Sequence, residues 1–398
     1  MAETGALRQA NIWSAARRAG RLLVLTGGLL LAACQTIVPR GTGPETTSPA
    51  KPAPVQQGLP SDSERHRVAL LVPMSGSNAG VGQSIANATT LALLDTKATN
   101  IRITTYDTGK GVAGAINSAI ADGNKLILGP LTADEVSAAA GAARGAGVPI
   151  VSFSNDSGVA GNGVFIMGYT PAQSVDRVVE YARGRGMSRF AALVPAGVYG
   201  ERTGNALLAA VRAHGGTVVA MQNYSRTAGS LAAAVKKLGP PTDYEAVLIA
   251  DSGRVALQAA PLLRKGGATT ARILGTELWN TENDIAASPA LRGAWFASVS
   301  DAYYRQLATK YRARFNTPPY RLAALGYDAV LLTVRIAQDW RPGSAFPVSR
   351  LTDKGGFAGI DGAFRFGGNG LAERALEVQQ VDADGFTVID AAPRGFGE

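Results

Sequence analysis

Short apolar segments alternate with amphipathic helical patterns along most of this 398-residue chain, and this alternation constrains the fold most strongly. Residues 67–72 form a nearly continuous apolar run that ends at Pro73, as expected for a parallel strand buried on both faces. A Gly-rich turn at 75–82 and a helical stripe containing Ile85 follow. Further strand patterns lie at 101–106, 125–128, 149–153 and 164–167, with helical patterns at 113–121 and 133–143. Strands separated by helices predict right-handed crossovers and a doubly wound parallel sheet.

A second set of strands and helices begins at Thr170. Pro171 suits the first helical position, and Gln173 is placed to complete a capping box with Thr170. Strand patterns follow at 190–194, 217–220, 246–250, 273–274 and 295–298, helical patterns at 200–213, 231–238, 254–263, 303–315 and 322–340, and short tail strands at 362–366, 376–381 and 387–389. We therefore expect an α/β fold of two doubly wound parallel-sheet lobes joined by a hinge with several crossings.

The N-terminal segment has the pattern of an export signal. Four arginines precede the apolar run 22–31, which is too short to span a bilayer as a stable helix but suits a signal-peptide core. The sequence Leu31-Ala32-Ala33-Cys34 resembles the bacterial lipobox, which implies a signal peptide over 1–33 and lipidation of Cys34. Gln35 stands where Asp would mark retention in the inner membrane of enteric bacteria. We therefore expect the lipid to hold the protein on the periplasmic face of the outer membrane, with inner-membrane anchoring as the alternative.

Residues 34–65 are rich in Pro, Ser, Thr, Gln and Gly and have no apolar periodicity, so we expect a disordered tether.

The formal net charge of +9 falls to +6 once the four arginines and Glu3 of the signal segment are removed. No cluster of Lys and Arg interleaved with aromatic residues occurs, so a nucleic-acid partner is not expected. A single Cys excludes a disulfide scaffold or a multi-Cys cluster, and two widely separated His make an imidazole metal site improbable. We expect neither metal nor cofactor.

Several motifs along the chain carry a family resemblance. In order they are S-G-x-x-x-x-x-G-Q at 75–83, D-T-G at 107–109, L-G-P-L at 128–131, V-P-I-V-S-F-S-N-D at 148–156 and L-G-T-x-L-W at 274–279. From about 68 to 389 the chain resembles type I periplasmic binding proteins. It is closest to the branch of leucine-binding receptors and, within that branch, to the penicillin-binding-protein activator lipoproteins.

The resemblance also implies how the chain divides into lobes. The two-lobed domain should cover 66–390 and leave a short tail at 391–398. The first lobe should comprise about 66–168 and 319–345. The second lobe should comprise about 169–318 and 346–390.

Ligand-site candidates lie in the loops that follow the strands, because ligands of open α/β sheets bind beyond the carboxyl ends of the strands. From the first lobe we select Ser75, Ser77, Thr132, Ser154, Asn155 and Asp156, and from the second Tyr199, Asp251, Ser252 and Glu277. The loop at 75–82 has neither the Lys of a P-loop nor the G-x-G-x-x-G pattern, so nucleotide binding is disfavoured. Its hydroxyls and free N–H groups would suit a carboxylate or another small anion.

Local structure offers an alternative for several of these candidates. Thr132 and Glu135 have capping-box spacing, and the segment 154–156 suits an Asx turn. Tyr199 could pack at the hinge or form a wall of the site. The resemblance implies a ligand carboxylate near Thr132 and a ligand ammonium near Glu277. However, Ser252 stands where receptors often have an aromatic residue, so the amino-acid cage of the receptors is not reproduced.

No enzyme signature is present. His66 lies at the end of the tether and His214 at a helix end, so a Ser–His–Asp triad is not supported. The resemblance implies a non-enzymatic lipoprotein that activates a peptidoglycan synthase, with a class A penicillin-binding protein as its partner. The alternative is an ABC-transporter solute-binding lipoprotein that captures amino acids or related small carboxylates.

Overall fold

The computed structural model describes residues 64–396, and these lie within one compact unit, Gly58–Glu398. Cys34, the predicted signal peptide and almost all of the predicted tether fall outside the described residues. Within the described range, no helix has the length and apolar character needed to cross a membrane.

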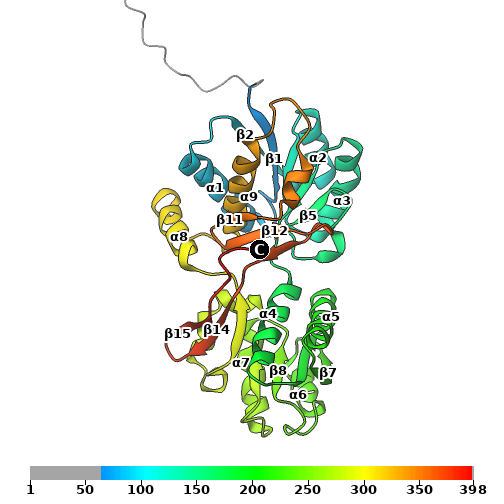
Figure 1. Ribbon diagram of the computed structural model, residues 1–398, viewed down its shortest axis with the longest axis vertical. Coiled ribbons are helices and arrows are strands. Elements are labelled where there is room, and N and C mark those ends of the chain that lie inside the picture. Colours follow the sequence, from blue (N-terminus) through cyan, green and yellow to red (C-terminus); the bar gives the residue numbers. More distant parts are fainter. Residues whose placement is uncertain (1–63, 397–398) are drawn as a thin grey trace, which may run out of the picture. The chain divides into compact units, whose positions relative to one another are not determined.

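The first lobe contains a five-stranded parallel sheet in the order β2-β1-β3-β4-β5. Strands β1, β2 and β5 of this sheet are labelled in Figure 1. The strands are β1 (His66–Val72), β2 (Ile101–Asp107), β3 (Leu126–Leu128), β4 (Ile150–Ser152) and β5 (Val164–Ile166). The helices are α1 (Ala79–Thr96), α2 (Val112–Ala121), α3 (Ala133–Gly145) and α9 (Ala323–Ala337). Alternate residues of β1 face opposite ways: Leu70 packs with α1 and α9, and Leu71 packs with α2 and α3. The predicted strand buried on both faces is therefore present.

The second lobe contains a seven-stranded sheet in the order β15-β14-β10-β9-β8-β6-β7. The five strands β6 (Arg189–Pro195), β7 (Thr217–Tyr224), β8 (Ala246–Ile249), β9 (Arg272–Leu274) and β10 (Trp295–Ser298) are parallel. β14 (Glu377–Asp382) and β15 (Gly385–Asp390) add to this sheet in antiparallel fashion. The helices are α4 (Pro171–Gly184), α5 (Val198–Ala213), α6 (Ala228–Lys237) and α7 (Gly253–Lys265).

Short 3₁₀ helices occur in both lobes, at Thr108–Lys110, Ser157–Val159, Glu277–Thr281, Asn283–Ala287, Pro289–Leu291 and Val348–Thr352.

Both lobes use glycine to bring the helix that follows their first strand close to the end of that strand. A Cβ atom on Gly82 of α1 would lie 1.9 Å from the carbonyl oxygen of Pro73. A Cβ atom on Gly200 of α5 would lie 1.7 Å from the carbonyl oxygen of Pro195. A Cβ atom cannot be accommodated at such distances, so both positions require glycine. The two lobes therefore share the same close packing of a helix on the end of the preceding strand.

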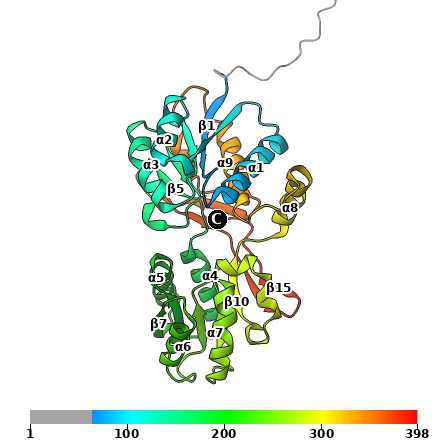
Figure 2. The same ribbon diagram turned by 180° about the vertical axis from the view of Figure 1, so that it is seen from behind.

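The division into lobes differs from the sequence-based one. Helix α8 (Ala302–Phe315), predicted to belong to the second lobe, packs through Leu307 and Tyr311 with residues of α1 and α9 in the first (Figure 2). The segment after α9 also joins the first-lobe core, through Phe346, Leu351, Phe357, Phe364, Phe366 and Ala372. A small antiparallel sheet of β11 (Phe357–Gly359), β12 (Gly362–Phe366) and β13 (Ala372–Arg374) forms there. The sequence could not assign these segments, because an apolar face does not specify which of two cores it packs against.

The two predicted capping boxes have different outcomes. At Thr132 the box is present: its hydroxyl accepts from the backbone N–H of Glu135 (3.4 Å), and the Glu135 carboxylate accepts from the N–H of Thr132 (2.9 Å). At Thr170 the prediction was wrong. Its hydroxyl accepts from the side-chain amide of Gln173 (2.8 Å), whose carbonyl oxygen accepts from the backbone N–H of Arg374 (2.8 Å). Gln173 thus connects the second lobe to a crossing segment.

Candidate ligand-binding site

A cavity of about 440 Å³ lies where loops at the carboxyl ends of both sheets meet the segments that cross between the lobes. Apolar walls come from Leu131 and Phe153 of the first lobe and from Leu278 and Val299 of the second. The crossing segments contribute Tyr169, Arg321, Leu322, Arg374 and Leu376. Mostly apolar walls with a few placed polar groups are typical of small-molecule sites.

Three of the ten predicted candidates line this cavity: Thr132, Asn155 and Glu277. Another seven do not: Ser75, Ser77, Ser154, Asp156, Tyr199, Asp251 and Ser252. The loops that bear them were identified correctly, but most of the chosen side chains have local partners instead.

The first-lobe candidates outside the cavity have structural roles. Ser75 is hydrogen-bonded to Asp107, and Ser77 is exposed. The Ser154 hydroxyl accepts from the backbone N–H of Asp156 (3.1 Å). The Asp156 carboxylate accepts from the N–H of Gly158 (2.7 Å), as an Asx turn requires, and pairs with Arg202 of α5 at 3.0 Å. Asp156 therefore links the two lobes.

Asp251 of the second lobe has a full set of hydrogen bonds beneath the sheet edge. It is 2% exposed, and its carboxylate accepts from the Tyr224 hydroxyl (2.8 Å), Arg226 Nε (2.9 Å) and the backbone N–H of Ser252 (2.8 Å). Ser252 lines a separate cavity of about 340 Å³. This region is outside the cavity between the lobes.

Glu277 supplies a carboxyl group to the second-lobe wall. Its Oε2 accepts from the Ser174 hydroxyl at 2.6 Å, and the Tyr199 hydroxyl lies 3.1 Å from Oε1. Burial raises the pKa of Glu277, while the hydrogen bonds from Ser174 and Tyr199 oppose that rise. Tyr199 also lies 3.0 Å from the Thr276 hydroxyl, so it stands behind Glu277 and holds its orientation.

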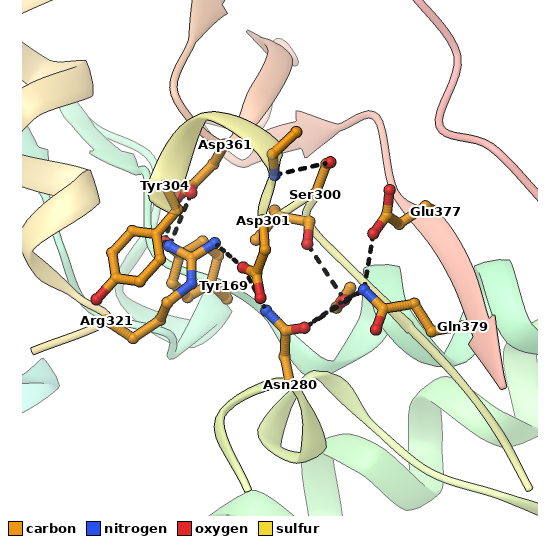
Figure 3. A network of polar contacts seen from close by, with 12 residues as sticks. Tyr169, Asn280, Ser300, Asp301, Tyr304, Arg321, Asp361, Glu377 and Gln379 are labelled. Atoms are coloured by element: carbon orange, nitrogen blue, oxygen red, sulfur yellow. Dashed lines mark hydrogen bonds and ion pairs between the residues drawn. The ribbon is translucent and has the colours of Figure 1, made fainter. Parts of the chain in front are cut away.

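The sequence reasoning missed two arginines of the crossing segments. Arg321 forms two ion pairs: Nη1 lies 2.7 Å from Asp361 and Nη2 lies 3.2 Å from Asp301, and the guanidinium packs over the ring of Tyr304 (Figure 3). The Tyr169 hydroxyl donates to the same Asp361. A hydrogen-bond network on the second-lobe side continues from Asp301 through Asn280, Ser298, Gln379 and Glu377. Figure 3 labels Asp301, Asn280, Gln379 and Glu377 of this network.

Arg374 differs from Arg321 because no carboxylate among residues 64–396 forms an ion pair with its guanidinium. It is 7% exposed, and Nη2 donates to the backbone carbonyl of Met167 at 2.7 Å. Its Nε and Nη1 are buried and have no hydrogen-bond partner among residues 64–396, and no ion pair to it occurs in that range. The rings of Tyr169 and Phe364 lie 5.1 and 5.2 Å from its guanidinium carbon. The only sequence signal was an Arg within the short pattern Ala372-Glu373-Arg374-Ala375-Leu376, which is too weak to mark a site.

No group of three or more His, Cys, Asp or Glu side chains suited to a metal ion occurs in the described part of the chain. The groups that line the cavity are its apolar walls, the hydrogen-bonded carboxyl group of Glu277, and Arg321 and Arg374 from the segments that cross between the lobes.

Two α/β lobes with a cavity where the chain crosses between them define a two-lobed binding protein. A family model described as periplasmic binding protein matches residues 66–386, and the chain belongs to this family. The resemblance to type I periplasmic binding proteins, and the predicted fold, are thereby confirmed. The finer assignment to the activator lipoproteins stays a prediction.

Among curated proteins, the chain is 29% identical to an uncharacterised protein of Rickettsia prowazekii over 136 residues. That match covers 34% of this chain and spans only 36% of the length of the relative.

Several solved structures share the fold. A Rhodospirillum rubrum protein described as a branched-chain amino acid ABC transporter has a TM-score of 0.71 at 20% identity and covers 82% of this chain and 100% of its own. The isoleucine complex of the Streptococcus pneumoniae substrate-binding protein LivJ has a TM-score of 0.61 at 19% identity, covering 83% and 100%. A benzoate complex of a solute-binding protein from R. palustris has a TM-score of 0.60 at 16% identity, covering 84% and 98%.

Proposed function

We propose that this protein is a non-enzymatic periplasmic binding protein that takes up a small molecule in the cavity between its lobes. The observation that carries the proposal is the cavity itself, which combines apolar walls from both lobes with the oriented carboxyl group of Glu277. A volume of about 440 Å³ lies within the range of typical ligand pockets, roughly 300–1,000 Å³.

The solved relatives support a solute-binding role without fixing the solute. One of them holds isoleucine and another benzoate. Capture of an amino acid or related small carboxylate for an ABC transporter is compatible with this cavity. Because Thr132, Asn155 and Glu277 all line it, the ligand would contact the first lobe through Thr132 and Asn155 and the second through Glu277.

Calorimetry on the purified protein tests this function. The panel contains the proteinogenic amino acids, aliphatic and aromatic carboxylates, their neutral amides, and short peptidoglycan peptides. We expect micromolar binding of at least one compound, with loss of affinity in Leu278→Asp, which places a charge on the apolar wall. The matched control is Leu208→Asp, because Leu208 is an exposed residue of α5 outside the cavity. Absence of binding across the panel would exclude the proposed function for these ligand classes.

A second candidate function is activation of a peptidoglycan synthase, with a class A penicillin-binding protein as partner. Its specific support is the loop at 153–156, whose Phe-Ser-Asn-Asp sequence gave the resemblance to activator lipoproteins and whose Asp156 pairs with Arg202 across the lobes. A protein whose lobes are tied together in this way could present a fixed surface to a partner. The lipobox at Cys34 and the Pro-rich segment would place it in the cell envelope, on the outer or inner membrane.

Reconstitution separates the two functions. The lipidated protein is added to a class A penicillin-binding protein with lipid II, and glycan polymerisation and cross-linking are followed. Stimulation that Arg202→Glu abolishes, and that the exposed control Arg212→Glu leaves intact, would support the activator role. Unchanged synthase rates together with micromolar solute binding would exclude the activator role and support solute binding as the function.

A further inference from the structure

Resting on the proposed solute-binding function, we propose that the ligand is a small organic carboxylate and that Arg374 is the residue that binds its negative group. Arg374 lies at the end of β13, where the chain crosses from the small sheet to β14, and it lines the cavity. The ligand would therefore be held by a crossing segment as well as by the two lobes.

The first argument is the state of the guanidinium in the free protein. A buried charge is normally paired or fully hydrogen-bonded, because removing it from water is otherwise unfavourable. Arg374 has one hydrogen bond, from Nη2 to Met167, while Nε and Nη1 have no partner among the described residues. An anion arriving in the cavity would supply the missing acceptor, and hydrogen bonds to charged groups are among the stronger ones in proteins.

No carboxylate among the described residues forms an ion pair with Arg374. Asp361 pairs with Arg321 at 2.7 Å, so its charge is already matched. Asp328 is fully buried, and its oxygens accept from the backbone N–H groups of Ile360 (2.6 Å) and Asp361 (3.4 Å) rather than from Arg374. Burial, and then the charge of Asp361, raise the pKa of Asp328 to about 7 although the charge of Arg374 opposes that rise, so Asp328 is an incomplete counter-ion near neutral pH.

The second argument is that Arg374 is already held in position. Its backbone N–H donates to Gln173 at 2.8 Å, and its side chain lies against the rings of Tyr169 and Phe364. Preorganised groups lose less conformational entropy on binding than free side chains do. The arginine is therefore fixed at the cavity before any ligand is present.

The remaining walls describe the rest of the ligand. Leu131, Phe153, Leu278 and Val299 favour an apolar body. Glu277 would accept an amino group if the ligand has one, and an aromatic or aliphatic acid without an amine would leave its hydrogen bonds to Ser174 and Tyr199 intact. Amino acids and simple carboxylic acids share the group that Arg374 would bind.

The test compares acids with their neutral amides on the full-length protein. The pairs are L-leucine and L-leucinamide, benzoate and benzamide, and hexanoate and hexanamide, measured by calorimetry at pH 7.5. In the wild type, the preferred acid should bind about tenfold or more tightly than its amide. Binding of L-leucine alone would identify an amino acid, and binding of benzoate or hexanoate would identify a simple acid; both outcomes support the proposal.

Two variants assign the effect to the side chain. Arg374→Gln should weaken acid binding by about tenfold or more and remove the preference over the amide, whereas Arg374→Lys should keep part of it. The matched control is Arg365→Gln on the neighbouring strand β12, because Arg365 already pairs with Glu373 at 2.7 Å. The wild-type comparison of acid and amide needs no variant and remains decisive if Arg374→Gln fails to fold.

The outcomes separate this inference from the proposed function. If amides bind as tightly as acids, or if Arg374→Gln binds the acid with wild-type affinity, the role of Arg374 is wrong while solute binding stands. If no compound of the panel binds the wild type, the proposed function and the inference are both overturned.

Discussion

Two buried charged side chains differ in how many hydrogen-bond partners they have: Asp251 in the second lobe, and Arg374 in a segment that crosses between the lobes. Asp251 accepts hydrogen bonds from Tyr224, Arg226 and Ser252. Arg374 is 7% exposed and keeps two N–H-bearing nitrogens without partners in the described part of the chain.

The difference indicates which charge belongs to the framework and which to function. A buried charge with all its partners is complete without a ligand, and its removal should affect folding. A buried charge that lacks partners contributes less to folding and gains most from a ligand. The first should therefore be sensitive in stability measurements, and the second in binding measurements.

The largest stability effect should come from Asp251→Ala. Removing the carboxylate leaves the buried Tyr224 hydroxyl and the Ser252 N–H without their acceptor, and we expect a loss of about 2–3 kcal/mol in the free energy of unfolding. Denaturant unfolding measures it, with Asp243→Ala as the exposed control in the same lobe. A loss no larger than that of the control would break the comparison.

A pH-dependent effect should follow from Asp328→Asn near Arg374. Because the pKa of Asp328 is raised in the folded state, its stabilising contribution is complete below about 3.8 and is lost as the pH rises through the raised value. Relative to the wild type, the variant should therefore become more stable by about 1–2 kcal/mol between pH 4 and pH 8. Unfolding curves at both pH values give this difference. A constant offset would show that Asp328 is ionised throughout and compensates Arg374.

Tyr199→Phe should have an intermediate effect. The variant loses the hydroxyl that lies near both Thr276 and Glu277, and a loss of about 1 kcal/mol is expected. Tyr303→Phe is the matched control, because Tyr303 is 61% exposed on α8. If both variants unfold at the same denaturant concentration, Tyr199 does not hold Glu277 in place.

The smallest stability effect should come from Arg374→Met. The variant loses one hydrogen bond and the contacts with two rings, but it also removes a poorly compensated buried cation. We expect a net change below about 1 kcal/mol in thermal or denaturant unfolding. A loss similar to that of Asp251→Ala would mean that Arg374 belongs to the framework, which contradicts its assignment to the ligand.

The sequence predicted features that depend on neighbouring residues. The capping box of Thr132 and Glu135 formed as expected, and Pro171 begins α4. The strand β10 at Trp295–Ser298 was located to the residue. Such signals are reliable because the partners are a few residues apart, so their geometry follows from the local backbone.

Long-range choices were beyond the sequence. The loops after the strands were found, yet Asp156 turned out to pair with Arg202 and Asp251 with Arg226. Helix α8 was predicted correctly as a helix and assigned to the other lobe. A side chain in a loop can point toward the ligand or toward its own lobe, and only the packing of distant segments decides between them.

The amino-acid sequence by itself therefore determined two α/β lobes of similar plan and the loops at their strand ends, because hydrophobic periodicity and capping are properties of contiguous residues. Tertiary structure alone decided that Tyr169, Arg321 and Arg374 meet at one cavity, although 152 residues separate the first two. The physical reason is that burial and hydrogen-bond satisfaction are properties of the folded surroundings. The two unpartnered nitrogens of Arg374 can be recognised only once the fold has placed the groups around them.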